Sequence, residues 1–338
     1  MEYLGDIWFV LWALLWGIYF ALDGYDFGIG MLLPIIGMST QKERDTMHQV
    51  TGPFWDGNEV WLITAGGVTF AAFPLAYAVL FSSLYTPLML LLLVLIMRGV
   101  AAEFRHQWNH PHWRTFWDLT VAACGFLAAL LLGVAFSNIF RGLPLDQNHI
   151  FQGNILNLLH PYALLGGLLF VVMFATHGAM YLSWHVSGDL EKKAAMMAKV
   201  LWPVFMLCFL VYVLLTFFWA GLYRNFFESP LMLALPAACL VSFLASGHYL
   251  YRTDKMNKAF LYSGVGIISL ALTGVMGMYP NLLPSRLDPL GAVTIANGAS
   301  TPKTLFIMLV VALIFVPIVI CYQWWTHRKL SEKLDPEY

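Results

Sequence analysis

The sequence predicts an all-α, polytopic membrane protein with nine transmembrane helices, and composition and hydropathy support this. Hydrophobic residues make up 60% of the 338 positions and charged residues only 11%, whereas soluble domains carry about 25% charged residues. The mean hydropathy is +0.71. The apolar residues form blocks near the roughly 20 residues that cross a bilayer as a helix, without the strict alternation of a membrane β-barrel. Because the formal net charge is −1 and there is no basic patch, nucleic acid is not an expected partner.

Nine apolar blocks define the predicted spans. The first block is longer than one crossing needs, so this helix is expected to tilt or protrude. Pro, Gly and Asn in the two longest external connections, 138–159 and 280–304, mark surface loops. No connection is long enough for a second domain, so residues 1–338 are expected to form a single integral membrane domain. The spans are placed at 7–37, 53–73, 77–97, 117–137, 160–185, 200–221, 231–250, 259–279 and 305–325.

The basic residues predict the orientation. Lys and Arg concentrate in short cytoplasmic loops, and all but four of the 18 Lys and Arg residues fall in connections after the first, third, fifth, seventh and ninth spans. This alternation supports an odd number of spans. It places the N-terminus outside and the C-terminus in the cytoplasm. The four exceptions are Arg141, Arg224, Arg286 and Lys303.

Two acids lie inside the first span. Asp23 and Asp26 occur in the run LDGYDFGIG (residues 22–30), three residues apart and therefore on one helix face. An Asp at the centre of a spanning helix costs about 2.5–3.5 kcal/mol, so both are expected to face protein, a cation or water. Two carboxylates this close resist double ionisation, which suits a proton relay. The alternative is a buried ion pair that fixes helix packing.

The second and third spans add charges near the predicted cytoplasmic surface. The run GPFWDGNEVW (residues 52–61) places Asp56 and Glu59 in the first turns of a helix, where the helix dipole favours carboxylates. After the third span, Arg98 is placed to neutralise an acid on a neighbouring helix, and Glu103 is placed at an entrance. The acids would form a ladder from the cytoplasm toward mid-membrane. Ordinary helix-end charges are the alternative for Asp56, Glu59, Glu103 and Arg105.

Histidines and cysteines provide no expected ligand set. His177 is the only one of 10 histidines well inside a span. We interpret it as a packing histidine rather than a haem ligand, because no second histidine is expected at its depth. The four cysteines lie in apolar blocks without a C-x-x-C pair. No haem ligand and no metal site are therefore expected in this chain. The four-residue spacing of Gly24 with Gly28, and of Gly133 with Ser137, predicts close helix packing.

Two runs resemble a known family. LDGYDFGIGML (residues 22–32) resembles the first-helix signature of subunit II of the cytochrome bd quinol oxidases, and WDGNEVWLITAGG (residues 55–67) resembles its second-helix signature. The resemblance continues through residues 98–105, GVAFSN (residues 133–138) and the loop around Pro284. It implies a terminal oxidase of a bacterial or archaeal cytoplasmic membrane that oxidises quinol and reduces O₂ to water. In this family a subunit I partner carries two b haems, haem d and the quinol-oxidising loop.

The resemblance also implies roles by position. Asp23 and Asp56 match acids of a cytoplasmic proton path, Glu103 stands where the family often has Asp, and Asp26 matches the second acid of the first-helix motif. Arg98 matches a basic residue of the same region and is the expected charge partner. Glu59, where some members have Gln, is an accessory candidate. Membrane lipid is an expected partner; a bound quinone and a small single-span subunit are left open.

Two other functions remain open from the residues alone. A proton-coupled secondary transporter would use the same acids, but it predicts broken helices and an inverted repeat, which the sequence does not show. A purely structural membrane subunit would use its acids only to pair with a partner.

Overall fold

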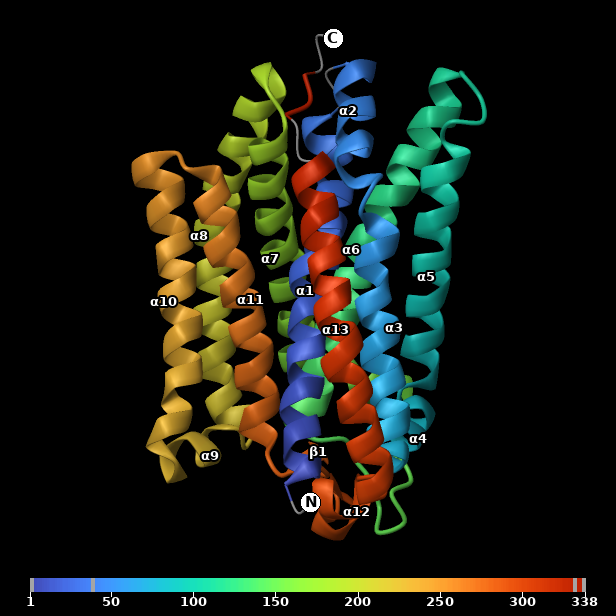
Figure 1. Ribbon diagram of the computed structural model, residues 1–338, viewed down its shortest axis with the longest axis vertical. Coiled ribbons are helices and arrows are strands. Elements are labelled where there is room, and N and C mark those ends of the chain that lie inside the picture. The colour runs from blue at the N-terminus through green and yellow to red at the C-terminus, as the bar shows by residue number, and fades with distance from the viewer. Residues whose placement is uncertain (1–2, 38–39, 331–332, 336–338) are drawn as a thin grey trace.

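The computed structural model describes residues 3–37, 40–330 and 333–335, which form an elongated helical bundle (Figure 1). Within these ranges, eight helices are long and apolar enough to cross a membrane, and the bent pair α3–α4 raises the number of crossings to as many as nine. The predicted all-α membrane architecture is confirmed. The helices are α1 (Leu4–Ile36), α2 (Gln41–Thr51), α3 (Trp55–Ala72), α4 (Pro74–Ser83), α5 (Tyr85–Phe104), α6 (Pro111–Arg141), α7 (Pro161–His185), α8 (Gly188–Trp219), α9 (Tyr223–Glu228), α10 (Ala234–His248), α11 (Met256–Met278), α12 (Ile295–Gly298) and α13 (Pro302–Leu330).

Short elements close the end of the bundle where α1 begins. Strands β1 (Asn281–Leu283) and β2 (Val293–Thr294) pair antiparallel there, and α12 follows them. Four 3-10 or π turns complete the structure: η1 (Ile155–Leu158), η2 (Pro230–Leu233), η3 (Tyr249–Thr253) and η4 (Pro289–Gly291). We call the end where α1 begins the N-terminal end, and the end where α13 finishes the C-terminal end (Figure 1).

Helix α1 is the centre of the bundle and packs against α3, α6, α7 and α11. Small residues permit this packing. A Cβ built on Gly28 would lie 2.0 Å from the backbone oxygen of Phe174 in α7, and one on Gly133 would lie 2.3 Å from the backbone oxygen of Gly166. The close approach predicted from the glycine spacing is therefore confirmed.

The third span begins later than the sequence predicts. The apolar block at 77–97 is divided between α4, which bends from α3 by 120°, and α5, which begins at Tyr85. Helix α3 ends at Ala72, before Phe73 (φ −134°, ψ 63°), because the residue before a proline avoids the α conformation. As a consequence, Arg98 and Glu103 lie in the last two turns of α5 instead of in the connection after it.

Two further elements differ from the prediction at the C-terminal end. Helix α2 was not predicted; it begins where the side chain of Thr40 accepts the Glu43 N–H at 3.1 Å. Helix α8 begins at Gly188 rather than near 200. The connections rich in Lys and Arg follow helices that finish at this end, so a cytoplasmic C-terminal end remains our prediction.

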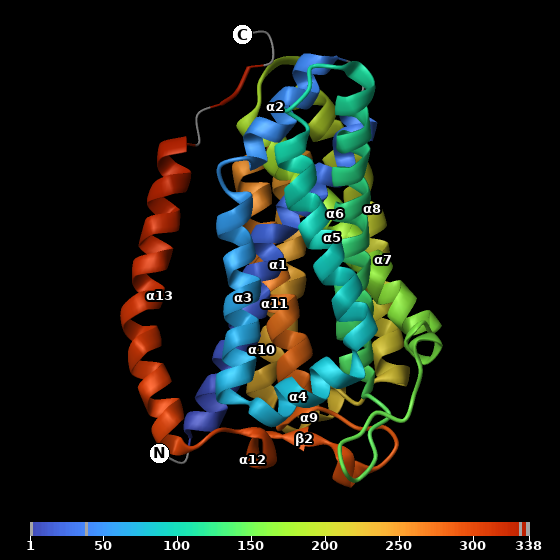
Figure 2. The same cartoon turned by 90° about the vertical axis from the view of Figure 1, so that its right-hand side faces the viewer.

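Helix α13 stands at the edge of the bundle (Figure 2). Only 6% of its apolar window is buried, compared with 78% for the window in α7. A long apolar surface is therefore left for lipid or for another polypeptide.

Candidate functional site

A buried ion cluster joins α1, α3 and α5. Arg98 Nη1 donates to Asp23 Oδ1 at 2.7 Å, and Arg98 Nη2 donates to Glu59 Oε1 at 2.6 Å. Asp23 is fully buried and Arg98 is only 6% exposed. The guanidinium also lies over the Phe27 ring, with its carbon 4.5 Å from the ring centroid. We call Asp23, Glu59 and Arg98 the Arg98 cluster.

Asp26 lies beside this cluster but binds a neutral group. Asn58 Nδ2 lies 2.7 Å from Asp26 Oδ2 and also 2.7 Å from the Tyr25 hydroxyl. Among the described residues, Asp26 Oδ1 has no hydrogen-bond partner. Asp23 therefore has a cation as its partner, whereas Asp26 has an amide. Asn58 was missed by the sequence reasoning because that reasoning followed charge, although the residue lies inside the second-helix motif.

A cavity of about 170 Å³ adjoins Asp26 and Arg98. Its other walls include His48, Glu103 and His106. Glu103 and His106 are exposed, so the cavity connects the buried acid with the surface near the C-terminal end of α5. Asp26, Arg98 and Glu103 therefore line one cavity.

Asp56 does not join this group. It is exposed at the start of α3, where its Oδ1 accepts the Gly57 N–H at 2.7 Å. In the structure Asp23, Asp26 and Glu59 lie near Arg98, and Glu103 lines the cavity, whereas Asp56 lies on the surface.

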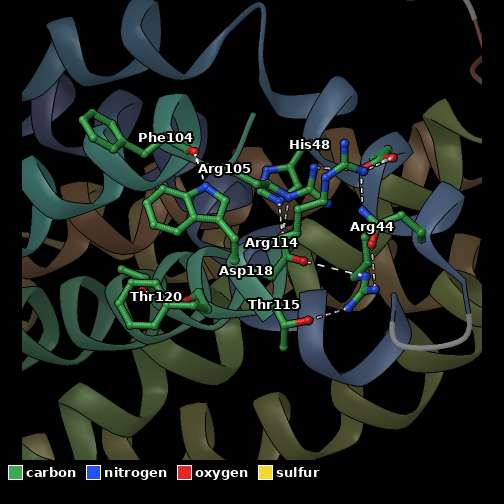
Figure 3. A network of polar contacts seen from close by, with 12 residues as sticks. Arg44, His48, Phe104, Arg105, Arg114, Thr115, Asp118 and Thr120 are labelled. Carbon is green, nitrogen blue, oxygen red and sulfur yellow. Dashed lines mark hydrogen bonds and ion pairs between the residues drawn. The ribbon is translucent and has the colours of Figure 1, made fainter. Parts of the chain in front are cut away.

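A second network holds α2 against α5 and α6 (Figure 3). Arg105 is fully buried. Its Nε donates to Asp118 Oδ1 at 2.5 Å, and its Nη1 lies 2.7 Å from Asp45 Oδ1 in an ion pair. His48 Nε2 is 2.8 Å from Asp118 Oδ1, and Arg44 Nε is 3.7 Å from Asp118 Oδ2. We call this group the Arg105 network; Arg105 is not an ordinary helix-end charge.

His48 connects the Arg105 network with the cavity. Burial lowers the pKa of His48 below its usual value near 6.5, although the hydrogen bond to Asp118 acts in the opposite direction. The imidazole is therefore neutral at pH 7. Because a carboxylate only accepts hydrogen bonds, the proton of the neutral ring lies on Nε2 and is donated to Asp118.

His177 lies in the core of the bundle. Its Nε2 lies 3.1 Å from the backbone oxygen of Ala21, and its Nδ1 lies 3.0 Å from Ser263 Oγ. Both ring nitrogens are engaged and the side chain is fully buried, so His177 does not fit the role of a haem ligand. In the part of the chain that the structure describes, no group of three or more His, Cys, Asp or Glu side chains is arranged to hold a metal ion.

Comparisons with known proteins give a consistent result. Residues 4–330 match the family described as cytochrome bd terminal oxidase subunit II. The chain is 32% identical to the cytochrome bd ubiquinol oxidase subunit 2 of Bacillus subtilis, with 99% of this chain and 98% of the relative covered. It is 31% identical to the cytochrome bd-I ubiquinol oxidase subunit 2 of Escherichia coli K12, with 99% and 96% covered. It shares the fold of a chain in the bd oxidase structure from Geobacillus thermodenitrificans, with a TM-score of 0.78, 18% identity, and 97% and 98% of the two chains covered.

Proposed function

Because this chain belongs to the cytochrome bd terminal oxidase subunit II family, we propose that its Arg98 cluster, Asp26 and the adjoining cavity form a proton-uptake path for the oxidase. The chain is a multi-pass membrane subunit of a quinol oxidase, a respiratory oxidoreductase complex. The transporter alternative is not supported, since the matching family and relatives are oxidase subunits.

The cavity is the observation that carries the proposal. It places the exposed Glu103 and the buried Asp26 on the walls of one space of about 170 Å³. A water molecule occupies about 30 Å³ in the liquid, so this space has room for several. Water molecules there would link a surface carboxylate to a carboxylate inside the bundle, and oxygen reduction in the complex consumes protons.

The partners of each acid suggest different roles. Arg98 offsets the charges of Asp23 and Glu59 through hydrogen bonds of 2.7 and 2.6 Å. Breaking such a buried pair is costly, so these two acids hold the site together. Asp26 accepts only from an amide and has one oxygen without a partner among the described groups. It is therefore the carboxyl group best placed to take up and release a proton. A role for Asp56 on the path is a separate hypothesis.

The complex contains haems, as its family implies. We infer that the two b haems and haem d are ligated by subunit I, where they supply the redox chemistry of quinol oxidation and O₂ reduction. This chain would support that partner and deliver protons toward it. The hydrogen bonds of His177 in the core are consistent with this division.

We further infer that subunit I packs against the face formed by α3, α5 and α13. Helix α5 packs on α6 and α3 packs on α1, and the apolar windows of α5 and α13 are only 17% and 6% buried. On α3, a Cβ built at Gly66 or Gly67 would meet nothing within 4 Å. Small residues on an open helix face permit close approach of another helix.

Blocking the cavity tests the proton path. Ala102 lines the cavity, so Ala102→Phe should displace its water and slow quinol-dependent O₂ consumption several-fold, while the haem spectrum of the purified complex stays unchanged. Val100→Phe introduces the same side chain on α5 away from the cavity lining and serves as the control. Full turnover of an Ala102→Phe complex with normal haem content would contradict the path.

A further inference from the structure

The N-terminal end of the bundle contains a second polar cavity, which the proton path does not use. It has a volume of about 500 Å³ and lies where α6, α9 and α11 meet the loop around Pro284. Arg141 and Arg224 line it, together with Asn225, Glu228, Tyr279 and Ser285.

Cations outnumber acids around this cavity. Arg141 is partly buried and lies over the Trp219 ring at 4.7 Å, and no carboxylate of the described residues forms an ion pair with it. The backbone of Arg286 lies close to Gly142, the residue after Arg141, because a Cβ built on Gly142 would lie 3.3 Å from the Arg286 backbone nitrogen. Arg224 pairs through Nε with Glu228 at 2.7 Å. The cavity is therefore lined by two guanidinium groups and one carboxylate, and the backbone of Arg286 lies close by.

Three other polar side chains of this cavity, those of Asn225, Tyr279 and Ser285, already have partners. Asn225 donates to the backbone oxygens of Gly277 and Tyr279. Ser285 Oγ donates to the Leu145 oxygen at 2.8 Å, and the Tyr279 hydroxyl donates to Asp6 at 3.1 Å. The donors that remain are the guanidinium N–H groups and the Asn281 amide. The fork geometry of the guanidinium groups matches an anion with several oxygens, such as a phosphate.

His160 does not change this charge balance. Burial, together with Arg141 and Arg286, lowers the pKa of His160 to about 4, so its ring is neutral at pH 7. Both arginines therefore act on one small region of the N-terminal end, and the positive charge there belongs to guanidinium groups.

An apolar cavity of about 340 Å³ adjoins the polar one. Phe140 and Leu222 line both. The apolar cavity extends between α8, α10 and α11 and is walled by Phe209, Tyr223 and Leu270. Trp and Tyr mark the interface level of membrane proteins, and Trp219, Tyr223 and Tyr279 lie here. Together the two cavities are complementary to an amphiphile that has an anionic head and an apolar tail.

We propose that these two cavities bind one phospholipid with an anionic headgroup, whose phosphate lies at Arg141 and Arg224 and whose acyl chain enters the apolar cavity. The site is at the opposite end of the bundle from the cavity beside Asp26, so it is independent of the proton path. It would place an ordered lipid at the membrane surface that the basic residues predict to be external.

Lipid binding to the intact complex tests this proposal. The purified oxidase complex is delipidated in detergent, dioleoylphosphatidylglycerol is added back, and bound lipid is counted by native mass spectrometry. Arg141→Gln should weaken the binding of one lipid about tenfold or more, since a hydrogen-bonded charge is lost. Arg141→Lys, which keeps the charge, should lose less. Arg252→Gln, at an exposed arginine of η3 near the other end, is the matched control and should bind like the wild type.

Two further measurements use only the wild-type complex, so their results do not depend on whether a variant folds. Binding of the anionic lipid should weaken as salt is raised, and dioleoylphosphatidylcholine should bind less tightly. Equal lipid binding by the wild type and Arg141→Gln would overturn the site. Displacement of the lipid by inorganic phosphate at the same concentration would overturn the assignment to a lipid and indicate a free-anion site.

Discussion

Replacing Asp26 by Asn removes the buried acid of the site that lacks a cationic partner among the described residues. The side chain keeps its shape, and its amide oxygen can still accept the Asn58 N–H that lies 2.7 Å from Asp26 Oδ2. The change keeps this hydrogen bond, so the free energy of unfolding should change by about 1 kcal/mol or less. The complex should therefore assemble with normal haem content, although position 26 can no longer carry a proton.

Turnover should respond far more than stability. A positioned group that transfers a proton contributes about 10²–10⁴-fold to a rate, so we expect quinol-dependent O₂ consumption by Asp26→Asn to fall about 10²-fold. Oxygen uptake by the purified complex is measured together with its reduced-minus-oxidised haem spectrum and its thermal denaturation midpoint. These readouts separate a loss of proton transfer from a loss of assembly.

Asp56→Asn is the matched control because it makes the same chemical change at an exposed position of α3. If the path runs through the cavity alone, this variant should keep its turnover; a slow Asp56→Asn complex with normal haems would instead place Asp56 on the path. An Asp26→Asn complex with wild-type turnover and haem content would show that Asp26 does not relay protons.

Three further changes test other parts of the structure. Arg98→Met leaves Asp23 buried without its cation, which costs about 3–5 kcal/mol, so the thermal midpoint of the complex should fall and adding Asp23→Asn should restore part of it; no fall would contradict a stabilising ion cluster. Because burial lowers the pKa of His48, the unfolded chain binds its proton at a higher pH than the folded chain, so stability is lost as the pH falls below about 6.5. His48→Gln, which keeps a donor for Asp118, should show a shallower decline of the midpoint between about pH 7 and pH 5, and an unchanged slope would contradict a neutral His48. Gly67→Trp should reduce the yield of complex assembled with subunit I several-fold, measured by co-purification; an unchanged yield would exclude the α3 face.

The membrane architecture could be predicted because the bilayer constrains the sequence strongly. Apolar blocks of sufficient length and the alternation of basic connections indicate the crossings. The error in the third span has a local cause: the apolar block at 77–97 contains the break at Leu84 between α4 and α5, and hydropathy does not detect such a break. Helix α2 was missed because it is polar, although Thr40 followed three residues later by Glu43 is a helix-start signal.

The charged residues of the site could be predicted from the sequence, because a charge inside an apolar segment is conspicuous. Asp23, Asp26 and Arg98 were identified because lipid does not tolerate them, and they lie together. Asn58 carries no charge and gave no such signal. Asp56 and Glu59 have the same spacing as Asp23 and Asp26, but only Glu59 turns toward Arg98, since Asp56 lies at the very start of α3. Which residue of such a pair faces inward depends on how α3 is rotated against α1, and spacing alone does not determine that rotation.

Proton uptake by the reconstituted complex tests the central claim most directly. Wild-type and Asp26→Asn complexes are placed in liposomes with one orientation, and a pH-sensitive dye follows proton consumption on the side of the C-terminal end after a pulse of oxygen. We predict rapid uptake on that side by the wild type and its near-complete loss in Asp26→Asn at equal haem content. Uptake of equal rate and extent in the two complexes would contradict a path through Asp26.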